Sequence, residues 1–243
     1  MPTGVIINAA AVFLGGIFGG FFGNKLSEDF KEKLNMIFGA CSMGMGIYSI
    51  APMKNMPAVI FAIILGTIFG LLIHLGTIFN KGAVLMQKPI TRIIPTENLS
   101  ISHQEFVSLM VTATVLFCAS GTGIYGSLAE GMSGDITILV SKSILDFFTA
   151  AIFAASLGYA VSIIAVLQLI IFVILFFLAQ FIIPFTNSTM ILDFKACGGF
   201  LMLATGFRML KLKMFPIAEM IPAMILVMPL SWVWMNIITP LIH

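Results

Sequence analysis

A lysine and an aspartate lie four residues apart inside an otherwise apolar stretch of the chain. The segment 136–146 reads ITILVSKSILD, so Lys142 and Asp146 share one face of the expected helix. At about 1.5 Å of rise per residue, Asp146 lies roughly 15 Å into that helix. In a membrane span this depth is near the bilayer centre, where a charge costs on the order of 2.5–3.5 kcal/mol. Pairing of the two charges, or a wet cavity around them, would reduce that cost.

Two interpretations of this pair stay open. In the first, Asp146 is a ligand for a cation or substrate, or a proton carrier, and Lys142 is its partner. In the second, the two side chains form an internal ion pair that only fixes the packing of helices.

Hydroxyl side chains and glycines alternate in segment 111–126, which reads VTATVLFCASGTGIYG. Its three glycines weaken a helix near one end. A break there would expose backbone groups, which transporters use to coordinate ions and anionic groups. Thr114, Ser120 and Thr122 are then candidate ligands. Close packing between helices is an equally good explanation of the small residues.

Asn8 and Gln168 are single amides in apolar surroundings. Each is either a ligand at a polar site or a residue that joins two helices by a hydrogen bond. With these two, the candidate residues for binding a solute or ion are Asp146, Lys142, Thr114, Ser120, Thr122, Asn8 and Gln168.

No catalytic or metal-binding motif accompanies these residues. The sequence lacks a Walker A motif, HExxH, CxxC and GxSxG, and its three histidines and three cysteines are dispersed. We therefore expect neither an enzyme nor a metal site nor a cofactor. Twelve Lys+Arg against ten Asp+Glu give a net charge of +2, too little to attract a nucleic acid.

The elements that must position the candidate residues are membrane helices. Of the 243 residues, 60% are hydrophobic and 9% are charged, against about 45–50% and about 25% in average soluble domains. This composition excludes a soluble globular enzyme and a disordered chain, and predicts an all-α polytopic membrane protein. We predict about eight transmembrane helices, at 4–23, 35–52, 57–79, 106–126, 136–158, 161–183, 194–210 and 217–238.

Basic residues between these spans predict the orientation, because Lys and Arg near span ends stay on the cytoplasmic side. Nine of them belong to the first, third and seventh loops, whereas Lys54 is alone in a loop on the opposite side. The nine are Lys25, Lys31, Lys33, Lys81, Lys88, Arg92, Arg208, Lys211 and Lys213. Both termini are therefore expected outside (N-out, C-out).

A shift of 160 residues aligns spans 1–2 with spans 6–7. Asn8 then matches Gln168, and two glycine pairs match, Gly39 with Gly199 and Gly46 with Gly206. After a gap of one residue, the Lys-x-x-Pro at 54–57 meets the Lys-x-x-Pro at 213–216. Chance similarity of apolar helices is the alternative to a true repeat. Because the matched triplets are five spans apart, a true repeat would be inverted, as in many secondary transporters.

We accordingly expect a single integral membrane domain over residues 1–243, with spans 1–3 and 6–8 as inverted repeats around central spans 4–5. Its parts are a first three-helix repeat (1–80), a cytoplasmic loop (81–105), central helices (106–158) and a second three-helix repeat (159–243).

Small residues form stripes on the first span, where Gly15, Gly19 and Gly23 are accompanied by Gly16 and Gly20. Such stripes let helix backbones approach closely. They predict a packing surface, and a homodimer through Gly15, Gly19 and Gly23 is one form that it could take.

Several of these stretches resemble a known family. The segments 4–16 (GVIINAAAVFLGG), 111–118 (VTATVLFC), 137–146 and 197–206 are similar in order and spacing to bacterial membrane proteins catalogued as domain of unknown function 554. The resemblance covers nearly the whole chain and is poorest over 81–105. It implies a multi-pass protein of the bacterial plasma (inner) membrane, described as a transporter or left unassigned, and it supplies no substrate.

The buried charged pair, the glycine-interrupted span and the repeat together favour a secondary transporter of a small solute or ion. Its partners would be the lipid bilayer and that solute or ion. The alternatives are a membrane scaffold or sensor that transports nothing, and a passive channel.

Overall fold

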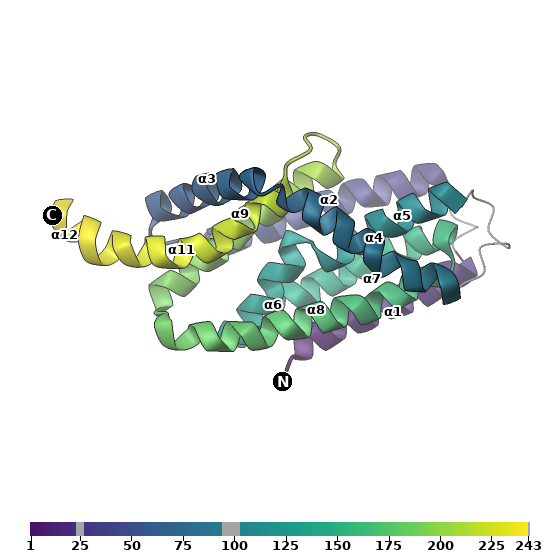
Figure 1. Ribbon diagram of the computed structural model, residues 1–243, viewed down its shortest axis with the longest axis horizontal. Coiled ribbons are helices and arrows are strands. Elements are labelled where there is room, and N and C mark those ends of the chain that lie inside the picture. The colour runs from purple at the N-terminus through teal and green to yellow at the C-terminus, as the bar shows by residue number, and fades with distance from the viewer. Residues whose placement is uncertain (23–26, 94–102, 243) are drawn as a thin grey trace. The chain divides into compact units, whose positions relative to one another are not determined.

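The computed structural model describes residues 1–22, 27–93 and 103–242, and these residues form helices joined by short turns, with no strand among them (Figure 1). The helices are α1 (Thr3–Phe22), α2 (Glu28–Ile50), α3 (Met56–Leu72), α4 (Leu75–Ile93), α5 (His103–Cys118), α6 (Gly121–Ser133), α7 (Thr137–Leu157), α8 (Ala160–Ile182), α9 (Ser188–Met209), α10 (Ile217–Met220), α11 (Pro222–Val233) and α12 (Thr239–Ile242). A 3-10 turn, η3 (Ile183–Phe185), follows α8, and a π-helical segment, η4 (Trp234–Ile238), follows α11.

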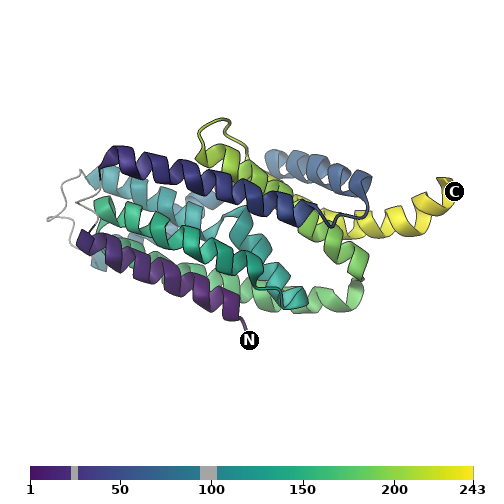
Figure 2. The same cartoon turned by 180° about the vertical axis from the view of Figure 1, so that it is seen from behind.

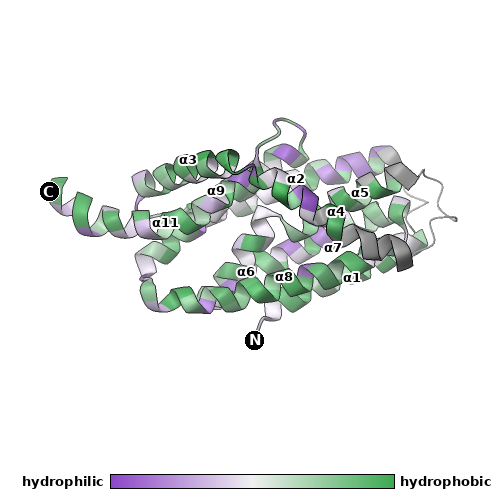
Figure 3. Ribbon diagram, viewed as in Figure 1, coloured by the Kyte–Doolittle hydropathy of each residue, from purple (hydrophilic) through white to green (hydrophobic). Residues whose placement is uncertain are grey.

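Six helical stretches in the described residues are long and apolar enough to cross a membrane, which is consistent with the helical membrane protein expected from the sequence. They are Thr3–Phe22, Leu109–Ser133, Thr137–Leu157, Ala160–Phe185, Ser188–Met209 and Ile217–Ile242. Figure 3 shows the hydrophobic colour over most of α3, α8 and α11. A seventh stretch joins α3 to the start of α4 across a 62° bend. The count of eight and the N-out, C-out orientation remain predictions.

The connection after α3 differs from the expected one. The sequence analysis placed 57–79 in one span and 81–105 in a loop, whereas α3 ends at Leu72 and α4 continues to Ile93. The break lies at His74, whose φ of 52° is left-handed and cannot continue a helix. Beyond it, Thr77, Asn80 and Lys81 recur at helical spacing, a pattern of one-sided polarity that average hydropathy does not detect.

The described helices group into two compact units. Unit 1 comprises Met1–Asn35 and Thr77–Phe177, and unit 2 comprises Met36–Gly76 and Leu178–His243. Each unit therefore combines two stretches that are separated in the sequence.

Close approach of α1 to α7 dominates the packing of unit 1 (Figure 2). A Cβ atom added at Gly15 would collide with the Phe147 carbonyl, and one at Gly19 would collide with the Ala151 backbone. Only glycine fits where two backbones come this close. Gly15 and Gly19 thus pack within one chain, and Gly23 lies outside the described residues. The homodimer through this stripe remains a prediction.

Unit 2 uses the same device twice. A Cβ at Gly39 would lie 3.1 Å from the Gly206 carbonyl, and a Cβ at Gly46 would lie 2.7 Å from the Gly199 carbonyl, so α2 and α9 touch through glycines. Likewise α3 meets α11 at Gly66, where a Cβ would strike the backbone of Ala223 (Figure 1). Small residues therefore decide which helices become neighbours.

Candidate functional site

Asp146 is the centre of a buried polar cluster in unit 1. Asn8 Nδ2 donates a hydrogen bond to Asp146 Oδ2 at 2.9 Å, and the Lys142 ammonium forms an ion pair with the same oxygen. Gln168 Nε2 lies 3.4 Å from Oδ2 and donates to Asn8 Oδ1 at 2.8 Å. Three helices, α1, α7 and α8, thus converge on one carboxylate.

All four side chains of this Asp146 cluster are removed from solvent. Asn8 and Gln168 are 0% exposed, Lys142 is 4% exposed and Asp146 is 7% exposed. A buried carboxylate is tolerated only with a compensating charge and hydrogen bonds. Lys142 supplies the charge, and the two amides supply the hydrogen bonds.

The sequence places these groups together through helical spacing. Lys142 and Asp146 share a face because four residues separate them. On α1, Asn8, Val12, Gly15 and Gly19 recur at spacings of four, three and four, so they also share a face. Since the glycines of that face lie against α7, Asn8 comes within hydrogen-bond reach of Asp146.

The apolar stretch 109–133 is interrupted between α5 and α6, as the glycines and hydroxyls of the sequence suggested. Ser120 Oγ caps α6 by accepting a hydrogen bond from the Gly123 N–H at 3.1 Å. The Phe117 carbonyl, in the last turn of α5, lies 3.4 Å from Gln168 Nε2. Carbonyls of a last turn have no partner within their own helix, and here one of them faces the Asp146 cluster.

The seven residues predicted from the sequence therefore separate into three groups. Asp146, Lys142, Asn8 and Gln168 form the cluster, and Ser120 is the cap of α6. Thr114 and Thr122 are buried, at 1% and 5% exposure, in α5 and in the first turn of α6.

Three further buried or partly buried carboxylates are not among the seven residues predicted for the site. In unit 1, Glu130 accepts hydrogen bonds from the N–H groups of Gly4 and Val5 at 2.8 and 3.1 Å, at the start of α1. In unit 2, Glu219 accepts one from the Gly76 N–H at 3.2 Å, at the start of α4. The third, Asp193, lies beside the start of α3.

Asp193 is 0% exposed and fully hydrogen-bonded. It accepts from the N–H groups of Lys54 and Asn55, both at 2.9 Å, from Asn55 Nδ2 at 2.9 Å and from Ser231 Oγ at 2.6 Å. Asn55, at the N-cap of α3, makes no capping side-chain bond itself. A carboxylate from another helix thus binds the two amides that directly precede α3, in the favourable field of that helix N-terminus.

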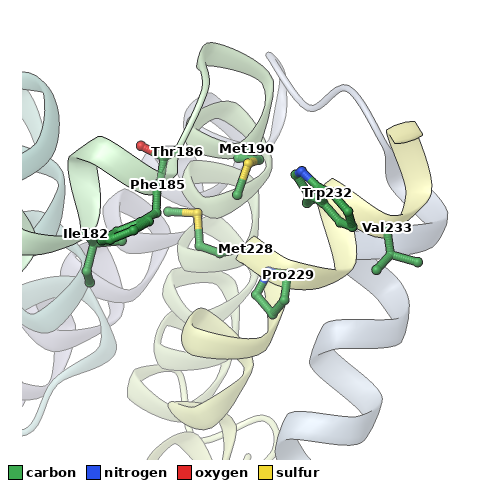
Figure 4. Close-up of a pocket in the computed structure, with 8 residues that line it drawn as sticks. All are labelled: Ile182, Phe185, Thr186, Met190, Met228, Pro229, Trp232 and Val233. Carbon is green, nitrogen blue, oxygen red and sulfur yellow. The ribbon is translucent and has the colours of Figure 1, made fainter. Parts of the chain in front are cut away.

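An apolar pocket of about 470 Å³ lies within unit 2 (Figure 4). Its lining residues are Ile182, Phe185, Thr186, Met190, Met228, Pro229, Trp232 and Val233. The lining offers a hydroxyl and an indole but no titratable group, so this pocket has no acid–base or ion-pairing chemistry to offer. In the described part of the chain, no three His, Cys, Asp or Glu side chains gather as a metal site.

Comparison with known proteins identifies relatives over almost the whole length. Residues 3–232 match the family described as protein of unknown function (DUF554). The chain is 43% identical to the uncharacterized protein YqgA of Escherichia coli (strain K12) over 234 residues, 96% of this chain and 98% of that protein. It is 25% identical to the uncharacterized membrane protein YdfK of Bacillus subtilis (strain 168) over 227 residues, 92% and 93% of the two chains. No solved structure matches. The family resemblance of the sequence is confirmed.

Proposed function

We propose that this chain, which belongs to the DUF554 family, is a secondary transporter that moves a small solute or ion across the bacterial plasma membrane. The observation that carries the proposal is the Asp146 cluster: a carboxylate inside an apolar helix, paired with Lys142 and hydrogen-bonded by Asn8. Ionisable groups inside membrane helices are costly, and they mark the pathways of substrates and ions in transporters.

The interruption between α5 and α6 supports a transport site rather than a packing device. Broken helices near the middle of the membrane supply backbone carbonyls and amides to substrates and coupling ions. Here the broken end of α5 lies beside the cluster, since the Phe117 carbonyl is 3.4 Å from Gln168 Nε2. An ion pair that served packing alone would not need this opening.

The helix bounds support an inverted repeat. Shifted by 160 residues, α1 and α2 become 163–182 and 188–210, which nearly coincide with α8 at 160–182 and α9 at 188–209. Shifted by 159 residues, the offset that matches the two Lys-x-x-Pro sequences, α3 becomes 215–231, which lies within two residues of 217–233, the range that α10 and α11 fill together. Inverted repeats give a carrier two related conformations, open to opposite sides of the membrane.

Contacts between matched residues support the repeat independently. In unit 1, Asn8 is bonded to Gln168, its own match. In unit 2, Ser42 Oγ donates to the carbonyl of Met202, also its match, at 3.0 Å. Equivalent positions of two repeats meet where a local two-fold axis passes between them.

The glycines on either side of Ser42 follow the same rule. Gly39 touches Gly206, the match of Gly46, and Gly46 touches Gly199, the match of Gly39. Such an exchange of partners is expected of a self-complementary interface.

The test begins with the thermal stability of the detergent-purified protein against a panel of cations, amino acids and small organic ions. A ligand at 100 times its dissociation constant stabilises the folded state by about 2.7 kcal/mol. Asp146→Asn should abolish the shift. Asp193→Asn is the matched control, because that aspartate is equally buried but caps α3 in unit 2.

Each ligand found in this way is then supplied as a gradient to proteoliposomes. A carrier shows uptake that saturates and accelerates in exchange with the same solute inside, whereas a passive channel shows flux proportional to the gradient. Absence of any ligand shift and of any flux, together with strong destabilisation by Asp146→Asn, would favour the scaffold or sensor instead.

A further inference from the structure

Two buried oxygen atoms in unit 1 have no hydrogen-bond partner within the described residues. They are Gln168 Oε1 and Thr114 Oγ1, on side chains that are 0% and 1% exposed. Buried polar atoms in proteins are paired almost without exception. Each of these oxygens can therefore accept a hydrogen bond from water or coordinate a bound cation.

Both atoms belong to side chains at α5, because Thr114 lies on that helix and Gln168 contacts its last turn. Gln168 reaches Asp146 Oδ2 and the Phe117 carbonyl with its Nε2, both at 3.4 Å. Thr114 precedes Phe117 by three residues on α5, so the two lie on one face of that helix. The hydroxyl of Thr114 is thus one helical turn from the carbonyl that Gln168 contacts.

One of the two carboxylate oxygens of Asp146 accepts no hydrogen bond from the described residues. The bonds from Asn8, Lys142 and Gln168 all go to Oδ2, and Oδ1 accepts none among the described residues. An ionised carboxylate has about four acceptor positions on its two oxygens. Oδ1 is therefore available to a further ligand while Asn8 and Gln168 keep their contacts with Oδ2.

The atoms that remain are oxygens of three kinds: a carboxylate, an amide and a hydroxyl, next to the carbonyls at the broken end of α5. Such hard donors suit alkali and alkaline-earth cations rather than transition metals. One carboxylate balances one positive charge, which favours a monovalent ion. The carbonyl end of a broken helix adds the negative end of the helix dipole.

We propose that Asp146, Gln168 and Thr114 form a binding site for Na⁺, and that Lys142 is a tethered cation that competes with it. In the sodium-free state the ammonium of Lys142 neutralises Asp146. When Na⁺ binds, it takes over this charge and the ammonium leaves the carboxylate. The inference rests on the proposed transport function in assigning its coupling ion, but Na⁺ binding can be measured without transport.

The experiment titrates the detergent-purified full chain with NaCl at constant ionic strength, with KCl and choline chloride as alternatives, and follows Tm and the binding of ²²Na⁺. At 100 times the dissociation constant, Na⁺ should raise Tm by about 5–10 °C, whereas choline should not. An equal shift with all three salts would contradict a sodium site.

Thr114→Val removes one unpaired oxygen with little change of shape, and Gln168→Leu removes the other together with the Nε2 group that donates to Asn8. Each should weaken ²²Na⁺ binding at least tenfold, and Thr114→Ser should restore it. The matched control is Ser49→Ala in unit 2, because Ser49 Oγ is also buried without a partner among the described residues but lies on α2. If Thr114→Val binds Na⁺ as tightly as wild type, the site is wrong.

The variant Lys142→Met tests whether the Lys142 ammonium competes with Na⁺ for Asp146 or only forms an ion pair with it. Without its tethered cation the protein should have a lower Tm in choline, a larger gain of Tm in NaCl than wild type, and tighter ²²Na⁺ binding. Unchanged or weaker Na⁺ binding by Lys142→Met would overturn the role of Lys142.

Different experimental results would refute the sodium site and the transport function. Solute flux that persists unchanged in sodium-free buffer, with no ²²Na⁺ binding, would retain the transporter and remove its sodium site. Binding of ²²Na⁺ that is lost in Thr114→Val, with no flux of any solute or ion, would retain the site and remove the transporter.

Discussion

Gln168 sets the orientation of the Asn8 side chain. Its Nε2 donates to Asn8 Oδ1 at 2.8 Å, and this bond turns the Asn8 amino group toward Asp146, 2.9 Å away. An amide on α8 thereby controls which group of an amide on α1 faces the carboxylate. The two amides act on Asp146 as one unit, although 160 positions separate them in the chain.

Asn8→Leu should destabilise the protein by about 1–3 kcal/mol, because it removes a hydrogen bond to a buried charge and leaves Gln168 Nε2 without its nearest acceptor. The measurement is Tm in detergent. Asn236→Leu is the control, since that exposed amide bonds only to the Trp232 carbonyl one turn earlier. Equal losses in the two variants would contradict a specific role of the amide pair.

Lys142→Met alone should be more damaging than the double variant Lys142→Met/Asp146→Leu. The single variant leaves a buried carboxylate unpaired, at a cost of about 3–5 kcal/mol, whereas replacement of a whole buried pair by apolar side chains is often close to neutral. Unfolding measured for both single variants and the double variant gives the coupling energy. A transporter should lose its activity in the double variant even where stability returns, and a scaffold should keep its cellular role.

Gly19→Ala should destabilise the packing of α1 on α7, since the added Cβ meets the backbone of Ala151. Overpacking of this kind costs about 1–3 kcal/mol. Gly44→Ala is the matched control, because a Cβ there has nothing within 4 Å, and alanine in a helix is favoured over glycine by about 0.5–1 kcal/mol. The two variants should therefore shift Tm in opposite directions.

Asp193→Asn should loosen the start of α3 without unfolding the rest of unit 2. The amide presents one acceptor oxygen where the carboxylate presents two, and the four hydrogen bonds from Lys54, Asn55 and Ser231 cannot all be kept. Faster hydrogen exchange at the amides of Lys54 and Asn55, with unchanged exchange in α9, is the expected result. Faster exchange throughout α9 would contradict a local role.

The inverted repeat predicts that Lys54 and Lys213, which are matched positions, face opposite sides of the membrane. Both side chains are exposed. In a protein whose three native cysteines have been replaced, a membrane-impermeant maleimide should label Lys54→Cys in intact cells. It should label Lys213→Cys only after lysis, as the distribution of basic residues requires. Labelling of both positions in intact cells would exclude the predicted topology.

Much of this architecture could be predicted from sequence because it is recorded in local patterns. Apolar length predicts membrane helices, and the four-residue spacing of Lys142 and Asp146 predicts their shared face. The alignment that pairs Asn8 with Gln168 identified two residues that are in contact. Ser120 was predicted as a ligand; in the structure its hydroxyl caps α6, and binding by Ser120 stays a prediction.

The remainder depends on contacts that no local pattern contains. Nothing around Glu130 or Asp193 in the sequence indicates that their oxygens meet amides in the first turn of α1 and directly before α3, which come from distant parts of the chain. Likewise, α4 carries its polarity on one side, so composition alone placed residues 81–93 in a loop. A lone carboxylate in an apolar helix was the available signal for the first case, and one-sided spacing was the signal for the second.

The amides at the start of α1 and before α3 are bonded by carboxylates from later segments of the chain. This affects the order in which these hydrogen bonds can form during synthesis. The chain emerges from the ribosome with α1 first, but the acceptor for the amides of Gly4 and Val5 is Glu130, which follows more than a hundred residues later. In the same way, the amides of Lys54 and Asn55 can form their hydrogen bonds to Asp193 only after that residue has been synthesised. Neither helix start reaches its final hydrogen bonding until a much later segment has entered the membrane, so early spans stay adjustable at one end while their eventual neighbours are still being made.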